Sequence, residues 1–137
     1  GKMHMAGVKE KYLETSLIKE MIASGADIIL LPTPGTVPGV TVEEVRKIVE
    51  QIHQAEGMAM NAIGTSQESA NEEIIQKLAL NSKLTGADIH HIGDAGYHGI
   101  AIPENIIAYS TAIRGKRHTQ RRMAVSMNRK IIGSEIK

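Results

Sequence analysis

The sequence predicts an α/β fold made of repeated strand–helix units, most simply the C-terminal half of a (β/α)8 barrel. The segments Gly25–Ile28 and Gly86–Ile89 are near copies of each other, and Gly57–Met60 lies between them. Each spacing of about 30 residues matches one strand, one helix and two short loops. Aliphatic runs follow the glycines, as in buried parallel strands. These three observations favour a parallel sheet whose strands alternate with helices.

Length and composition limit the prediction to a single domain, residues 1–137. A complete barrel of this type needs about 250 residues, so the pattern accounts for part of one. The chain contains no Phe, Trp or Cys, and its core must therefore consist of aliphatic side chains and Met. The alternative is a small open doubly wound sheet, although no dinucleotide-binding glycine fingerprint opens any unit.

The first elements precede the repeat. Residues 1–7 look like the end of a strand with its loop, and residues 11–24 are expected to form a helix. The expected apolar face of this helix is Leu13, Leu17, Ile18, Met21 and Ile22. We expect Gly25, Gly57 and Gly86 each to end a helix in the left-handed conformation before a strand begins.

Three further helices have start signals of their own. Thr41–Glu44 and Ser69–Glu72 fit the capping box, and Pro103 suits a first helical turn. The expected core-facing stripes are Val42, Val45, Ile48, Val49 and Ile52, then Ile74, Ile75 and Leu78, then Ile106, Ile107 and Ile113. A basic extension, residues 114–137, follows and holds eight Lys and Arg residues against Glu135 alone.

Composition also excludes several kinds of function. Without Cys there is no disulfide framework, no thiolate metal site and no cysteine nucleophile. No apolar stretch approaches the roughly 18 residues of a membrane span, and the start of the chain lacks the pattern of a signal sequence. We therefore expect a cytoplasmic protein without a membrane partner.

The loops that follow the strands are where ligands bind in both candidate architectures. Glycine-rich and hydroxyl-rich loops before helix starts present N–H groups and hydroxyls to an anion. The residues expected to bind a small phosphorylated or carboxylated molecule are Thr33, Gly64, Thr65, Ser66, Gly93 and Gly96. In the alternative interpretation, the glycines make tight turns and the serine caps a helix.

Candidates for proton transfer lie in the same loops. Asp94 is the acid of the last glycine-rich loop, where it faces a ligand unless it only forms a turn. His90 and His91 end a strand, and alternation points only one of them to the ligand side. We choose His91, which is nearer the loop, and add His4 from the end of the first partial strand. The metal stays unknown, and scattered structural histidines are the alternative.

Arg114 opens the basic extension, and we expect it to reach a phosphate group of the ligand. A solvated, charge-rich terminal helix is the simpler alternative. Nucleic acid is a disfavoured partner, because no aromatic residues interleave the charges for base stacking.

Five segments together carry a resemblance to a known family. They are Gly1–His4, Ala26–Gly39, Ala62–Glu68, Gly86–Tyr97 and Ala112–His118. They resemble the C-terminal half of an uncharacterised bacterial family labelled phosphoenolpyruvate phosphonomutase-like. Some members of that family carry the label haloacid dehalogenase-like hydrolase. The resemblance covers nearly the whole chain.

The resemblance implies a barrel of the phosphoenolpyruvate mutase and isocitrate lyase kind, in which Mg²⁺ and a carboxylate-bearing substrate occupy the rim of the full-length parent. The acidic metal-binding loops of the mutases would belong to the other half, and the cysteine-containing loop of the lyases has no counterpart here. A haloacid dehalogenase site needs two aspartates separated by one residue. No Asp-x-Asp occurs in the chain, so the hydrolase label is an inherited name.

A half-barrel leaves two free sheet edges and an apolar inner face. The residues expected on that face include Ile28, Leu30, Met60, Ala62 and Ile89. Burial of apolar surface contributes roughly 25 cal/mol per Å², and free edges recruit further strands. We therefore expect the missing N-terminal half, or a second copy of the chain in a two-fold dimer, to cover this face.

Overall fold

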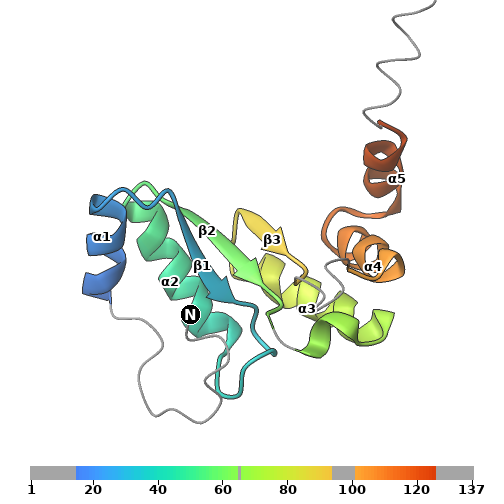
Figure 1. Ribbon diagram of the computed structural model, residues 1–137, viewed down its shortest axis with the longest axis horizontal. Helices are drawn as coiled ribbons and strands as arrows, with labels where there is room; N and C mark the ends of the chain where they lie inside the picture. Colours follow the sequence, from blue (N-terminus) through green and yellow to red (C-terminus); the bar gives the residue numbers. More distant parts are fainter. Residues whose placement is uncertain (1–14, 65, 94–100, 126–137) are drawn as a thin grey trace, which may run out of the picture.

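The computed structural model describes residues 15–64, 66–93 and 101–125. Within them the chain is a mixed α/β structure with a three-stranded parallel sheet and five α-helices (Figure 1). The helices are α1 (Thr15–Ala23), α2 (Val42–Gln54), α3 (Glu72–Leu84), α4 (Pro103–Arg114) and α5 (Lys116–Ala124), and the strands are β1 (Ile28–Pro32), β2 (Met58–Ala62) and β3 (Ile89–His91). A short 3-10 helix, η2 (Ser66–Ser69), precedes α3. The strand expected in residues 1–7 lies outside the described residues.

The strands lie in the order β1-β2-β3, and each is parallel to its neighbour. Leu30 lies opposite Met60, which in turn lies opposite Ile89. The carboxyl ends of all three strands therefore meet at one edge of the sheet. The predicted alternation of parallel strands and helices is confirmed.

Alternation along the strands gives the sheet two different faces. The covered face packs against the helices and consists of Ile29, Leu31, Ala59, Asn61 and His90. The open face carries Ile28, Leu30, Met58, Met60, Ile89 and His91. Leu30 keeps 51% of its surface exposed, whereas the adjacent Leu31 keeps 0%. Within the described ranges, the helices lie on one side of the sheet (Figure 1).

Two clusters fill the covered side. The first joins α1 and α2 to β1 and β2 through Ile18, Ile29, Leu31, Val45, Val49, Ile52 and Ala59. The second joins the end of β2 to α3 and α4 through Ile63, Ile75, Leu78, Ala79, Ala108 and Tyr109. The stripe predicted for α2 is confirmed by the first cluster. Beyond Gly115, α5 packs on α4, where Ser110 Oγ lies 3.0 Å from Thr119 Oγ1.

Several of the predicted helix boundaries are confirmed. Thr41 and Glu44 form the capping box of α2. Gly25 and Gly86 adopt the left-handed φ angles of 99° and 82° that end a helix before a strand. Pro103 occupies the first turn of α4.

Two boundary predictions are wrong. Asn71, rather than Ser69, caps α3, because Ser69 is the last residue of η2. The side chain of Asn71 accepts the N–H of Ile74 at 3.2 Å. Before β2 the left-handed residue is Glu56, with φ 65°, rather than Gly57. Gly57 instead permits close packing, since an added Cβ would lie 2.8 Å from Ile22 Cδ1.

The stripe predicted for α4 is also wrong in part. Ile106 and Ile107 are 47% and 43% exposed, while Asn105, Ala108 and Tyr109 turn inward. Asn105 sets this rotation, because its Nδ2 donates to the backbone oxygens of Glu68 and Ala70 at 3.0 Å and 2.9 Å. Other expected core residues that lie exposed are Leu17, Met21 and Ile74.

Candidate functional site

The carboxyl edge of the sheet brings together part of the predicted site. Thr33 follows β1, Gly64 lies just beyond β2, and Gly93 lies just beyond β3. The ladder continues past the strands, since the N–H of Thr33 donates to the oxygen of Ala62 and the N–H of Ile63 donates to that of His91, both at 2.9 Å. We call this edge, with the described loop residues 33–40, 63–64, 66–71 and 92–93, the rim.

Four predicted site residues cannot be placed on the rim from the structure. They are His4, Thr65, Asp94 and Gly96, and they lie outside the described residues. Ser66 is the first residue of η2, which lies at the rim.

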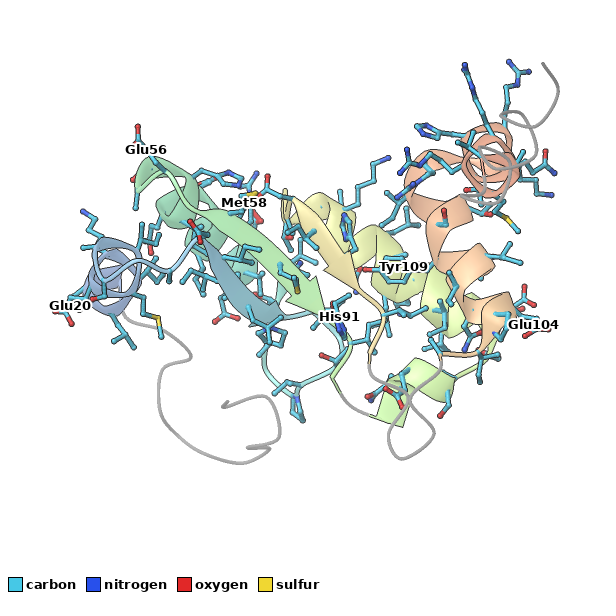
Figure 2. All side chains as sticks on the ribbon, turned by 45° about the horizontal axis from the view of Figure 1, so that its top comes forward. Glu20, Glu56, Met58, His91, Glu104 and Tyr109 are labelled. Atoms are coloured by element: carbon cyan, nitrogen blue, oxygen red, sulfur yellow. The ribbon has the colours of Figure 1, made fainter. Side chains whose placement is uncertain are left out.

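His91 is the last residue of β3, and its exposed side chain belongs to the open face (Figure 2). Its Nδ1 accepts the backbone N–H of Gly93 at 3.1 Å. A neutral imidazole whose Nδ1 accepts a hydrogen bond carries its proton on Nε2. In this neutral form, His91 presents an N–H hydrogen-bond donor at the rim.

Glu68 reaches the same place from η2, and the sequence alone did not single it out. A Cβ added at Gly93 would lie 2.5 Å from Glu68 Oε2 and 2.5 Å from the backbone oxygen of Ile63. Gly93 also has φ 113°, which other residues rarely adopt. A glycine is thus required for the Glu68 carboxylate to approach the backbone beside His91.

Thr33 contributes its backbone to the rim, but not its hydroxyl. Its side chain is fully buried on the helix side, and its Oγ1 has no hydrogen-bond partner among the described residues. The oxygen of Thr33 accepts the Thr36 hydroxyl at 2.7 Å, and Asn81 Nδ2 donates to the oxygen of Pro34 at 3.0 Å. These bonds fix the loop against α3, so a ligand at the rim would meet the backbone of Thr33 and not its hydroxyl.

His90 takes the opposite side of β3 from His91, inside a buried polar network. Its Nδ1 lies 2.8 Å from Ser82 Oγ and 3.3 Å from the hydroxyl of Tyr109, which extends from α4 toward β3 (Figure 2). Below them, Asn61 Nδ2 donates to Thr85 Oγ1 at 2.8 Å. These contacts leave His91 as the histidine of the pair that is exposed on the open face.

Burial dominates the titration of this network. It lowers the pKa of His90, and the positive charge of Arg114 lowers it further. Burial also raises the pKa of the Tyr109 hydroxyl, more than the neighbouring hydroxyl of Ser82 lowers it. Near neutral pH both groups are therefore uncharged, as a structural polar core requires.

Arg114 does not join the rim. It ends α4, and the preceding Ile113 accepts the ammonium of Lys83, from the last turn of α3, at 2.8 Å. The start of α4, by contrast, is held beside η2 by Asn105. Arg114 therefore lies at the far end of the helical layer, and the prediction that it contacts a ligand at the rim is not met within this chain.

The charges at the rim are negative. No Lys or Arg occurs in its described loop residues, while Glu68 lies within it and Glu72 follows directly. An anion at this edge therefore needs backbone N–H groups or a bound cation. No group of three or more His, Asp or Glu side chains that could hold a metal ion occurs in the described part of the chain.

The opposite edge of the sheet has a structural role. Asp88 Oδ2 accepts the N–H of Ala59 at 2.8 Å and lies 2.8 Å from His53 Nε2. Desolvation raises the pKa of Asp88, but these two partners together outweigh it and lower that pKa. The carboxylate thus ties β2, β3 and α2 together, as expected for a residue at the start of a strand.

Among residues 15–64, 66–93 and 101–125, no helix has the length and apolar content needed to cross a membrane.

The similarity of the chain to known proteins shows its family. No curated protein and no solved structure matches the chain. A family model matches residues 1–129, which is most of the sequence. The chain therefore belongs to the family described as Domain of unknown function (DUF7916).

Proposed function

We propose that the chain supplies part of the rim of a (β/α)8-type barrel, and that this rim binds a small carboxylated or phosphorylated metabolite together with Mg²⁺ for a mutase-like or lyase-like reaction. The observation that carries the proposal is the convergence of His91, Gly93 and Glu68 at the carboxyl edge of adjacent parallel strands. Enzymes built on parallel α/β units place their chemistry at this edge. The substrate class also rests on the resemblance to phosphoenolpyruvate phosphonomutase-like proteins.

The arrangement of the sheet supports a barrel over the doubly wound alternative. A doubly wound sheet carries helices on both faces and reverses its strand order at one point. In the described residues the order is sequential, and the helices pack on one face. The open face is apolar, as expected for strands whose inner side chains fill a barrel.

The chemistry assigned to the chain's own residues follows from their contacts. His91 donates a hydrogen bond from its Nε2–H to an oxygen of the bound ligand, while the N–H of Gly93 fixes the imidazole ring. Glu68 repels a bare anion at this position, so a cation must accompany the ligand. This requirement connects the acidic rim to the expected Mg²⁺.

The donor set fits Mg²⁺ within limits. Mg²⁺ prefers oxygen ligands and keeps several waters, often with only one or two carboxylates from the protein. Glu68 would be one ligand, and Asp94, three positions after His91, would be the second. When bound, the ion would neutralise negative charge on the ligand.

A second candidate is a non-catalytic module that binds an anion or a partner chain without turnover. The exposed apolar open face favours it, because parallel sheets normally have both faces covered. The missing N-terminal half, or a second copy of this chain, is the proposed cover. A metabolite panel assayed for turnover on the full-length parent distinguishes the enzyme from the binding module.

The binding proposal is tested by titrating the isotope-labelled chain with oxalate, a planar dicarboxylate, with and without Mg²⁺. We expect the amide resonances of Gly64 and Gly93 to shift only when both are present. Because Glu68 is the assigned ligand, Glu68→Gln should weaken binding by about 10- to 100-fold. His91→Ala should weaken oxalate binding while leaving the Mg²⁺ requirement in place.

His118→Ala is the matched control, since His118 is exposed on α5. Its affinity for oxalate should equal that of the wild type. Shifts that occur equally without Mg²⁺ would contradict the role given to Glu68. The absence of any rim shift with both components at millimolar concentration would contradict the binding site itself.

A further inference from the structure

The outer surface of α4 and α5 is divided into three zones along its length. An acidic zone lies at the start of α4, an apolar zone lies along its middle, and a basic zone covers the end of α4 and α5. The two charged zones are about 18 Å apart, the length of a 12-residue helix. This surface adjoins the rim at the start of α3, and it does not include the open face of the sheet.

The acidic zone gathers exposed carboxylates from two helices. Glu104 lies in the first turn of α4, and Glu72 and Glu73 lie in the first turn of α3. The two turns are held together by Asn105, whose Nδ2 donates to the oxygen of Ala70 at 2.9 Å. Figure 2 shows Glu104 at the end of α4 that is remote from α5.

The apolar zone consists of Ile106 and Ile107, which are turned outward by the anchoring of Asn105. These two adjacent isoleucines lie on neighbouring parts of the exposed side of α4 and form an apolar strip between the charged ends. α2 has no exposed large apolar side chain, whereas α3 exposes Ile74, Leu80 and Leu84.

The basic zone consists of Arg114 and the α5 residues Lys116, Arg117, Arg121 and Arg122, all exposed. Between Glu104 and Glu135 the sequence contains no acid. Salt bridges within the described residues involve Arg46 and His53, so the α5 cations have no carboxylate partner there. α5 extends from the end of α4 at the margin of the molecule (Figure 1).

We propose that α4 and α5 form a two-fold interface with a second copy of this chain. A two-fold axis brings the same surface of both copies together in opposite directions. The basic zone of one copy then faces the acidic zone of the other, twice, and the isoleucine strips meet on the axis. A surface that is acidic at one end, apolar in the middle and basic at the other is complementary to itself only in this arrangement.

The charges on the page favour a second copy over a nucleic acid as the occupant. A nucleic acid would satisfy the basic zone, but it would leave the isoleucines exposed and would be repelled by the acidic zone. Because charged zones at both ends of the interface supply much of the attraction, the association is strongly dependent on salt.

The test is sedimentation velocity over a concentration series of the whole chain. We expect association that weakens when NaCl rises from about 50 mM to about 500 mM, since the Debye length falls from above 10 Å to near 4 Å. The double variant Arg117→Glu/Arg121→Glu should weaken association by about tenfold or more at low salt. Adding Glu72→Lys/Glu73→Lys to the same chain should restore it, because the two zones exchange signs.

Ile107→Asp should also disrupt the dimer, and it provides an independent route if the arginine variants fold poorly. The matched control is Lys19→Glu/Lys47→Glu, which changes the net charge equally on α1 and α2. It should leave association unchanged.

Three results would overturn the proposal. The first is a monomer at every concentration and salt. The second is association that survives both Ile107→Asp and the arginine variants. The third is association that strengthens with salt and is lost in Leu30→Asp, which would identify the open face as the interface. None of these bears on the rim, whose test uses oxalate and Mg²⁺.

Discussion

Leu31 and Leu30 are adjacent leucines in β1, yet one lies beneath α2 in the core and the other lies on the open face beside Met60. The same contrast runs through β2 and β3, where Ala59 and His90 pack against helices. In the described residues, the side chains of the open face are apolar like those of an interior, but no helix packs on them. Parallel strands normally have both faces covered, so the apolar open face is consistent with the proposed further layer.

The largest expected difference between the faces is in stability. Leu31→Ala removes a fully buried side chain and should lower the free energy of unfolding by about 2–5 kcal/mol. Leu30→Ala makes the same change at the half-exposed neighbour and should lower the free energy of unfolding by less than about 1 kcal/mol. Urea denaturation of both variants measures the pair. Equal losses would mean that Leu30 is buried in solution, and would end the distinction between the faces.

The next largest effect on stability is expected at Gly93, which lies at the rim just beyond β3. Gly93→Ala places a methyl group against Glu68 and Ile63 in a left-handed conformation, and we expect a loss of about 1–3 kcal/mol. Gly25→Ala shares the positive φ but has nothing within 4 Å of its added Cβ. Its thermal unfolding midpoint should fall less. The opposite order would contradict the close approach of Glu68.

A third test separates satisfied from unsatisfied polar groups on the covered face. Thr85→Val removes the acceptor of Asn61 Nδ2 and should cost about 1–3 kcal/mol, because a buried amide loses its partner. Thr33→Val removes a buried hydroxyl that has no partner among the described residues. It should change the free energy of unfolding by less than about 0.5 kcal/mol. A large loss in Thr33→Val would mean that its hydroxyl is bonded in solution.

The smallest expected effect is the pH dependence that His90 gives to the covered face. Its pKa is lowered in the fold by burial and Arg114, while Asp88 opposes the shift. The unfolded chain then binds more protons, so stability should fall as the pH drops from about 6.5 through the folded pKa. His90→Asn should flatten this part of the profile. Asp88, whose pKa is also lowered, acts only below about pH 4, outside this window.

The alternation of strands and helices could be predicted from sequence because the glycine repeat and the α2 stripe are both strong and periodic. The rotation of α4 could not. Its sequence offers two stripes, and the choice depends on Asn105, which reaches two backbone oxygens that are more than 30 residues away. A polar residue that decides which face of a helix is buried gives no periodic signal.

The position of the rim could be predicted, but not all of the residues that meet there. Parallel strands bring their carboxyl ends together, so the loops that hold Gly64 and Gly93 were correctly expected at one edge. Glu68 was missed because an acid near a helix start is common and its approach to Gly93 is a tertiary contact. The burial of the Thr33 side chain could not be predicted, because the β1–β2 pairing determines which face of the sheet it joins.

Asp88 has a further consequence for the chemistry at the far edge of the sheet. By accepting the N–H of Ala59 through its side chain, while its own N–H donates to the oxygen of Ala59, it locks β3 to β2 in one register. A slip of one residue would exchange the two sides of β3, because side chains alternate. His91 would then be buried against α3, and His90 would lie on the open face. The residue that decides which imidazole is exposed at the rim is therefore a carboxylate at the opposite edge of the sheet.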